Sequence, residues 1–135
     1  IIQLFSKLRS YSAPTIPLPI QTLSAKLWSD ESHVLKSREL YKSKFDYADK
    51  KLSKFSLYKR PDAGFYLWLN VGNGEKFTKS LYKNFSLKVM PGSFLAKGKT
   101  ENPGESFVRV SLVHNLSKSK KAIDKIEKQI KCIQN

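Results

Sequence analysis

The sequence contains a single cysteine, two histidines and four arginines, and it has no apolar run of the ~20 residues that span a bilayer. Cys132 cannot form an internal disulfide, which is typical of a protein in the reducing cytosol. Residues 1–5 form too short an apolar stretch for a signal peptide and lack a cleavage site of small residues. No Cys/His spacing indicates a zinc site. We therefore expect a cytoplasmic protein with neither a metal site nor a membrane span.

Acidic residues are also scarce, since 11 Asp and Glu stand against 25 Lys and Arg in 135 residues, for a net charge of +14. The length suits one domain, and the hydrophobic fraction of 40% argues against disorder. So high a charge can indicate nucleic-acid binding, because phosphate contacts release counterions. However, the lysines are scattered and no arginine-rich run or RNP-like motif accompanies them. This favours a solvated surface that binds polyanions weakly, with a basic nucleic-acid-binding α+β module as the alternative.

The first part of the chain predicts helices around a proline-rich connector. Residues 2–10 and 20–28 have helical spacing of apolar side chains, and the prolines at 14, 17 and 19 predict an extended segment over residues 11–19. Ser29-Asp30-Glu31 then supplies a capping side chain and an acidic first turn for a long helix.

Residues spaced by three and four positions form a stripe along one face of the long helix, through about six turns. The stripe consists of Val34, Arg38, Tyr41, Phe45, Ala48, Leu52 and Phe55. Lys44 falls among the charged residues of the solvated face. Such a helix is either a spine between two bodies or a plain packing helix, and an exposed stripe would make the chain a partner-docking interaction domain.

From residue 59 onward the predicted order is strand, helix, strand, strand and helix, which defines a small α+β domain with a sheet of about three strands. The strands are predicted at residues 65–71, 87–90 and 107–113, and the first helix at 75–84. The first strand is apolar on both faces, so it should be central or covered on both sides. Ser117 is expected to cap the last helix, whose apolar stripe is Ile123, Ile126, Ile130 and Ile133. We therefore divide the chain into residues 1–29, the long helix 30–58 and the small domain 59–135.

The stretch 107–113 is the most informative, because it is an apolar, β-branched strand with one arginine at its middle. Alternation gives one face with Val108, Val110 and Leu112, and another with Phe107, Arg109, Ser111 and Val113. A buried guanidinium is costly unless an anion meets it, and its planar fork fits a carboxylate through two parallel hydrogen bonds. The residues alone leave two interpretations: a carboxylate-binding Arg109, or an arginine on the solvated face of a half-exposed sheet.

Four motifs resemble, in order and spacing, the C-terminal part of class I/II aminotransferases, which are fold-type-I enzymes dependent on pyridoxal phosphate. They are Asp62-Ala63-Gly64-Phe65-Tyr66-Leu67-Trp68, Val89-Met90-Pro91-Gly92-Ser93-Phe94, Asn102-Pro103-Gly104 and Val108-Arg109-Val110. The residues 28–34 and 41–45 resemble the start of the family's long interdomain helix. The pairing of residues 91–96 with 102–104 most resembles the N-succinyldiaminopimelate aminotransferase branch.

The resemblance implies an enzyme of amino-acid metabolism that moves an amino group between an amino acid and a 2-oxo acid. It places Arg109 where the family grips the substrate α-carboxylate. Ser93 and Phe94 fall on the loop at the mouth of the substrate pocket, for which the alternative is an ordinary strand-ending turn. Gly64 and Phe65 fall where the small domain faces the site, and their alternative is a turn glycine and a core aromatic residue.

The resemblance also implies what this region does not contain. In the family, the Schiff-base lysine, the acid that pairs with the pyridine nitrogen and the helix N-terminus that holds the phosphate all lie upstream. We therefore expect no catalytic or cofactor-binding residue in this chain, and no transaminase activity from the chain alone. The expected partners are the missing large-domain portion and, in the complete enzyme, a second copy in a homodimer. No specific nucleic acid and no membrane are expected as partners.

Overall fold

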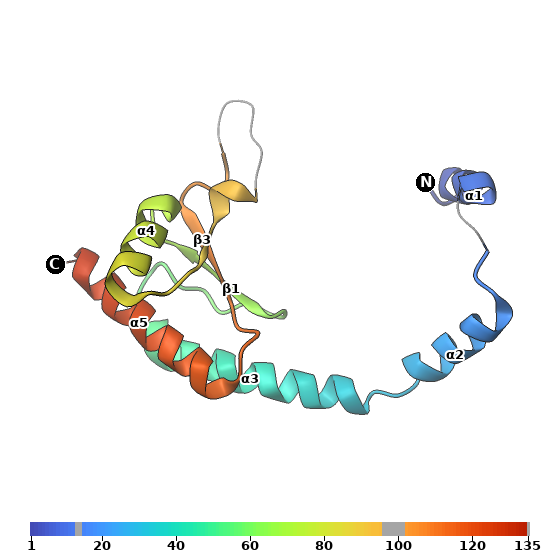
Figure 1. Cartoon of the computed structure of the whole chain (residues 1–135), viewed down its shortest axis with the longest axis horizontal. Helices are drawn as coiled ribbons and strands as arrows, with labels where there is room; N and C mark the ends of the chain where they lie inside the picture. The colour runs from blue at the N-terminus through green and yellow to red at the C-terminus, as the bar shows by residue number, and fades with distance from the viewer. Residues whose placement is uncertain (13–14, 96–101, 135) are drawn as a thin grey trace. The chain divides into compact units, whose positions relative to one another are not determined.

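The computed structural model describes residues 1–12, 15–95 and 102–134, and it divides into two compact units, Ile1–Lys36 and Ser37–Asn135. The first unit contains α1 (Ile2–Ser12), α2 (Leu18–Trp28) and the first residues of α3 (Ser32–Leu52) (Figure 1). The two predicted helices are therefore confirmed. Part of the expected connector, residues 13–14, lies outside the described residues.

The connector between α1 and α2 is shorter than the extended segment predicted over residues 11–19. Tyr11 and Ser12 still belong to α1, and α2 already begins at Leu18. Pro19 lies within the first turn of α2, where a missing N–H removes no intrahelical hydrogen bond. Proline at such a position is compatible with a helix start, so the prediction of an extended segment through residue 19 was wrong.

The long helix α3 is opened by Asp30, whose carboxylate accepts a hydrogen bond from the Ser32 N–H at 2.9 Å. The helix ends at Leu52, so the predicted stripe leaves the helix before its last member, Phe55. Tyr41, Phe45, Ala48 and Leu52 are buried or half-buried, whereas Arg38 is exposed. The stripe is thus confirmed for its C-terminal part, within the second unit.

A three-stranded antiparallel sheet forms the centre of the second unit. Its order is β1 (Tyr66–Asn70), β3 (Phe107–Ser111), β2 (Met90–Pro91) (Figure 1). The central strand is therefore β3, and β1 lies at an edge of the described sheet. Of the two predicted alternatives for the first strand, central or covered on both sides, the central position is excluded. β1 is apolar on both faces because Leu67 and Leu69 enter the core while Trp68 stacks on Phe107 on the other face, with 5.3 Å between ring centroids.

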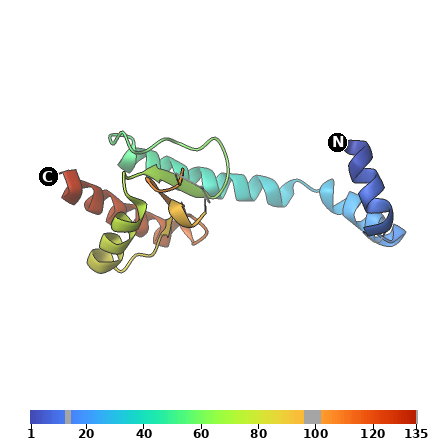
Figure 2. The same cartoon turned by 90° about the horizontal axis from the view of Figure 1, so that it is seen from above.

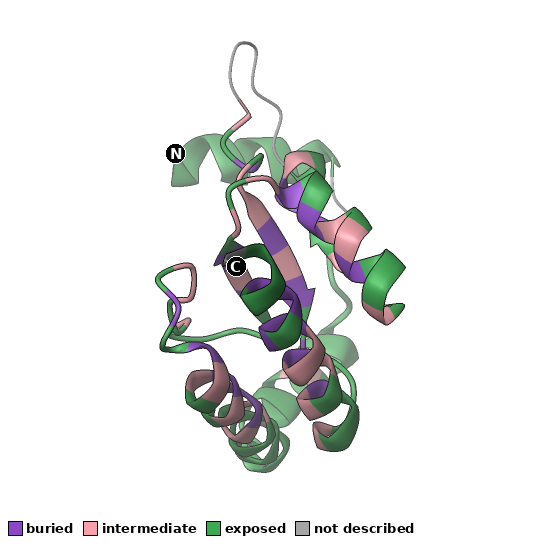
Figure 3. Ribbon diagram, turned by 90° about the vertical axis from the view of Figure 1, so that its left-hand side faces the viewer, coloured by how far each residue is buried: buried purple, intermediate pink, exposed green. Residues whose placement is uncertain are grey.

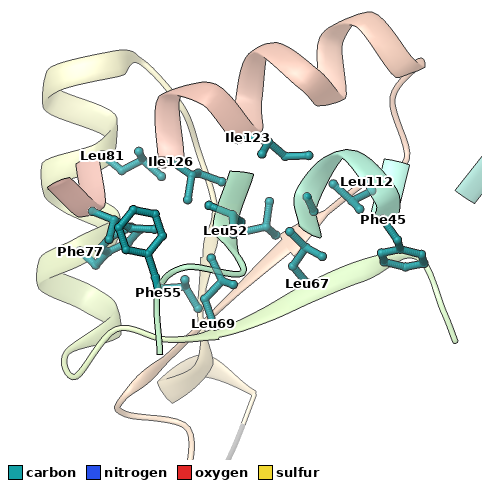
Figure 4. Close-up of a cluster of buried hydrophobic side chains, with 14 residues drawn as sticks. Phe45, Leu52, Phe55, Leu67, Leu69, Phe77, Leu81, Leu112, Ile123 and Ile126 are labelled. Carbon is teal, nitrogen blue, oxygen red and sulfur yellow. The ribbon is translucent and has the colours of Figure 1, made fainter. Parts of the chain in front are cut away.

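Three helices cover one face of the sheet. In the second unit α3 and α5 (Leu116–Gln134) lie side by side in both views (Figure 1 and Figure 2), and α4 (Gly74–Phe85) packs against α5 and β3. Their apolar side chains meet those of the sheet in one core (Figure 4), which contains Phe45, Ala48, Leu52, Phe55, Leu67, Leu69, Phe77, Leu81, Val108, Val110, Leu112, Ile123, Ile126 and Ile130. The predicted α+β class with a three-stranded sheet is confirmed.

The last helix differs from its prediction at both ends. The Asn115 side chain caps it by accepting a hydrogen bond from the Lys118 N–H at 2.9 Å, so Ser117 is not the cap. Ile123, Ile126 and Ile130 are buried as predicted, but Ile133 is exposed because the helix continues past the body it packs against. Asn is as good an N-cap as Ser, so the residue type could not decide between the two positions.

Candidate functional site

Arg109 lies at the middle of the central strand, on the face turned away from the core. Its neighbours Val108 and Val110 are buried in the core, and Arg109 itself is half-buried. Figure 3 shows this alternation of buried and half-buried residues along the strand. In register, Arg109 stands between Trp68 on β1 and Met90 on β2. The predicted division of this strand into two faces is confirmed.

The surroundings of Arg109 leave part of its guanidinium unpaired. Its Cζ lies 5.9 Å from the centroid of the Tyr66 ring, an arrangement that favours a cation. Its Nε is buried and finds no hydrogen-bond partner among the described residues. A buried donor without a partner costs about 1–3 kcal/mol. A carboxylate would remove that cost by accepting from the guanidinium fork.

A hollow of about 630 Å³ opens beside Arg109, and we call it the Arg109 hollow. It is bounded by residues 86–91, by β3 with the residues that follow it, and by the first turns of α5. Phe94, one of the predicted site residues, also lines it. The volume is in the range of small-molecule sites in proteins.

The loop that carries Ser93 and Phe94 is held by a second predicted motif. This loop is the short 3-10 helix η1 (Gly92–Phe94), and the Asn102 amide donates to the Ser93 carbonyl at 2.8 Å. Gly92 and Gly104 face each other so closely that a Cβ on Gly104 would lie 2.2 Å from the Gly92 carbonyl oxygen. The two motifs, twelve residues apart in the sequence, therefore lie against each other. Both glycines are needed there because two backbones meet.

The other two predicted site residues lie elsewhere. Gly64 and Phe65 line a separate hollow of about 680 Å³, between α3 and residues 60–65. Gly64 has φ +106°, a conformation that favours glycine, and the Phe65 side chain is 47% exposed, so it is not a core residue. The second unit therefore brings Arg109 and Phe94 to one hollow and Gly64 and Phe65 to another.

The segment before Gly64 is tied to α3 by a polar cluster. Arg60 forms ion pairs with Asp49 and with Asp46, the latter at 2.9 Å, and the Tyr58 hydroxyl donates to Asp49 at 2.5 Å. Hydrogen bonds from Lys42 and Arg60 lower the pKa of Asp46. Burial, together with the hydrogen bond to Asp49, raises the pKa of Tyr58. The cluster therefore fixes the turn at one end of β1.

Lys44 is buried, against the prediction that it lies on the solvated face. Its Nζ donates to the Leu112 carbonyl at 2.6 Å and lies 4.5 Å from the centroid of the Tyr41 ring. Burial lowers its pKa. Because Lys44 is three residues after Tyr41 and four before Ala48, helical spacing could have placed it on the buried side.

The Arg109 hollow and the buried lysine do not fit pyridoxal phosphate. Lys44 is the buried lysine of the second unit, but its ammonium group is already bonded to Leu112 beside the Tyr41 ring. The Arg109 hollow has no Asp or Glu in its lining that could pair with a pyridine nitrogen. No reaction step through this cofactor can be derived from these side chains. No cluster of three or more His, Cys, Asp or Glu suited to a metal ion occurs in the same part of the chain.

Solved structures that are similar to this chain include several aminotransferases. An aminotransferase from Neisseria meningitidis is 35% identical and has a TM-score of 0.80, over 95% of this chain and 34% of its own. An aromatic aminotransferase from Pyrococcus horikoshii is 26% identical with a TM-score of 0.72, over 95% of this chain and 35% of its own. The second unit with α3 therefore has the fold of the C-terminal domain of aminotransferases.

The sequence comparison agrees. The LL-diaminopimelate aminotransferase of Maridesulfovibrio salexigens is 28% identical over 102 residues, which are 73% of this chain and 25% of that protein. No family model matches the sequence. The chain is thus related to aminotransferases and spans between a quarter and about a third of the length of these relatives. None of the helices in the described residues is long and apolar enough to cross a membrane.

Proposed function

We propose that this chain is the C-terminal part of a pyridoxal-phosphate-dependent aminotransferase and that Arg109 binds the substrate α-carboxylate. The observation that carries the proposal is the half-buried Arg109 on the central strand, which lines a hollow and whose buried Nε has no hydrogen-bond partner among the described residues. A carboxylate held there would be oriented by two parallel hydrogen bonds before the reaction. Similarity to aminotransferases supports this assignment of Arg109.

In this proposal the remaining predicted residues shape the substrate pocket. Phe94 lines the Arg109 hollow, and its neighbour Ser93 donates a hydrogen bond to Glu75 at 3.1 Å, so both would lie at the mouth of the pocket. Gly64 and Phe65 line a separate hollow in this chain, and they would face the substrate site only in the complete enzyme. The complete enzyme would move an amino group between an amino acid and a 2-oxo acid, and pyridoxal phosphate would supply the electron sink. The substrate branch proposed is the N-succinyldiaminopimelate type.

We infer that the large-domain portion, and a second copy in a homodimer, are the partners of this chain. The first unit supports this inference, because the large apolar side chains of α1 and α2 are all exposed. We assign residues 1–29 to the end of the large domain, 30–58 to the interdomain helix and 59–135 to the small domain, in a cytoplasmic enzyme. The chain alone would be inert, since no lysine here lies in a cofactor-binding context.

The arginine assignment is tested by titrating the chain with propionate. Arg109→Gln should weaken propionate binding at least fivefold, because the guanidinium fork is lost while the strand is kept. Arg9→Gln is the matched control, since Arg9 is an exposed arginine that lines neither of the two hollows. Equal weakening in both variants would remove the basis for the assignment.

Inertness is tested separately by adding pyridoxal phosphate and then borohydride. We expect only slow labelling spread over many surface lysines. Stoichiometric reduction at one lysine would show that this chain holds the cofactor by itself and would contradict the proposal.

A further inference from the structure

The six lysines of α5 divide between two sides of the helix. Two of them make contacts on the side of α3: the Lys120 ammonium lies 5.1 Å from the centroid of the Tyr47 ring, and Lys131 pairs with Glu127 at 3.0 Å. The other four follow one another at intervals of three, four and three positions, which places them on a single side of an α-helix. We call these four residues the lysine row: Lys118, Lys121, Lys125 and Lys128.

Both acidic residues of α5 form their ion pairs on the side of α3. Asp124 pairs with Lys51 of α3 at 3.1 Å, and Glu127 pairs with Lys54, just after α3, at 2.6 Å. Among the described residues, no Asp or Glu forms an ion pair with a member of the lysine row. The acidic groups of α5 are therefore neutralised elsewhere, and the row is left with positive charge alone.

The ammonium groups of the lysine row are available to a ligand. Lys118, Lys121 and Lys128 are exposed, and Lys125 donates to the Phe85 carbonyl at the end of α4 at 2.9 Å. An ammonium group has three donors, so Lys125 can still donate to a second acceptor. The helix rises ~15 Å from the first to the last member of the row, since each residue adds about 1.5 Å. The row is thus a short line of like charges without a counter-charge.

We propose that the lysine row binds the phosphate backbone of duplex DNA, independently of base sequence. A duplex presents one negative charge for every ~1.7 Å of its axis, and ammonium groups that contact phosphates release its condensed counterions. The row contains no arginine, and so it lacks the planar fork that reads guanine. α5 also has no aromatic residue on which unpaired bases would stack. This inference goes beyond the proposed function, because binding by the row requires neither Arg109 nor a cofactor.

Two other polyanions fit the lysine row less well than a duplex. A helix that binds a membrane surface inserts an apolar face into it, but the apolar face of α5 is buried in the core through Ile123, Ile126 and Ile130. An unstructured acidic peptide carries at most one charge per ~3.4 Å when it is extended, which is about half the linear charge density of a duplex. The density of phosphates therefore favours the nucleic acid.

The test is a titration of a fluorescein-labelled duplex of about 20 base pairs with the full chain, followed by anisotropy between about 50 and 200 mM NaCl. Replacing Lys118, Lys121 and Lys128 together by glutamine should weaken binding about tenfold. It should also make the slope of log K against log salt concentration shallower by about 2.7, because each lost phosphate contact removes about 0.9. Circular dichroism checks that the variant is folded, which we expect because the three side chains are exposed.

A second triple variant with the same net charge is the matched control. Lys36, Lys50 and Lys59 are exposed lysines outside α5, and replacing these three by glutamine should change the slope by less than about 1. An equal loss of affinity in both triple variants would show that the net charge of the chain, rather than the lysine row, binds the duplex, and it would overturn the proposal.

Competition identifies the partner. An unlabelled duplex of unrelated sequence should displace the labelled one at equal concentration, whereas poly-L-glutamate and phosphatidylglycerol vesicles at the same concentration of charge should not. Preference for one base sequence, tighter binding to the single strand, or displacement by poly-L-glutamate or the vesicles would contradict a site for the duplex backbone. Carboxylate binding at Arg109 is measured separately, so a failure of either proposal is distinguishable from a failure of the other.

Discussion

The two units of this chain use similar apolar residues in opposite ways. In the second unit, leucines and isoleucines from α3, α4, α5 and the sheet are fully buried around one core. In the first unit, α1 and α2 also carry large apolar residues, yet no residue of either helix is buried. Helical amphipathicity alone therefore does not create a core, because a helix face is stabilised only when a second surface covers it.

The largest expected difference between the two units is in the stability lost when a leucine is replaced by alanine. Leu81→Ala should destabilise the second unit by about 3 kcal/mol, since it leaves a cavity in a closed core. Leu27→Ala, at a position 61% exposed, should change stability by less than about 0.5 kcal/mol. Urea denaturation followed by tryptophan fluorescence or circular dichroism measures both. A cost at Leu27 as large as that at Leu81 would mean that the first unit has a core of its own.

The exposed apolar face of the first unit predicts self-association of the chain at high concentration. Replacing Phe5 and Leu8, which are both exposed on α1, by serine should lower the association constant several-fold by removing apolar surface. Tyr82→Ser, on the exposed side of α4, is the control in the second unit. Sedimentation equilibrium gives the comparison. If only the control reduced association, the interface would lie in the second unit instead.

A third difference is that, among the described residues, ion pairs between elements occur in the second unit and not in the first. Glu127 is buried and forms ion pairs with Lys54 and Lys131. Hydrogen bonds from these two lysines lower the pKa of Glu127 to about 2. Glu127→Gln should cost about 1–2 kcal/mol at pH 7, whereas Glu31→Gln in the first unit should cost nothing measurable.

The sign of the pH dependence at Glu127 follows from its lowered pKa. A carboxylate whose folded pKa is below its unfolded value stabilises the fold above the unfolded pKa, and this contribution is lost as the pH falls through the folded pKa. The difference between parent and Glu127→Gln should therefore be largest above pH 5 and shrink toward pH 2. A difference that is constant over this window would show that the ion pairs do not act on stability.

The smallest expected effect compares the residues at the start of the last helix. Asn115→Ala should cost about 1 kcal/mol, because the Lys118 N–H loses its acceptor. Ser117→Ala should cost a few tenths at most, since Ser117 is exposed and does not provide the cap. Thermal unfolding of the two variants distinguishes them. A larger loss of stability in Ser117→Ala than in Asn115→Ala would show that Ser117 is the cap.

Much of the second unit could be predicted from local patterns. Alternation placed Val108 and Val110 in the core, and helical spacing placed Phe45, Ala48 and Leu52 there. The order of the strands could not be predicted from composition. β1 is an edge strand, but Trp68 covers its outer face by stacking on Phe107, so β1 is as apolar as a central strand would be. The burial of Lys44 was not predicted, because a lysine is normally exposed even where its helical spacing matches the buried face. A long side chain can nevertheless bury its stem and donate to a backbone carbonyl.

The candidate site was predictable in its parts but not in its assembly. The motifs around Gly92 and Gly104 were both recognised, yet only the structure shows that they touch, since the contact is made by backbone atoms that the residue types do not specify. The other basic residues that line the Arg109 hollow, Lys88 and Lys118, were missed because they come from different segments. The position of Lys88 near Arg109 could have been found only from the pairing of Met90 with Arg109.

The most direct test of the account is the NMR signal of the Arg109 Nε–H, assigned by its loss in Arg109→Gln. On titration with propionate this signal should move strongly to higher frequency and saturate, because a buried donor that has no partner gains a carboxylate acceptor. If the Arg109 signal stays in place while signals from surface lysines move, the guanidinium does not bind carboxylates, and the proposed role of this strand in an aminotransferase is wrong.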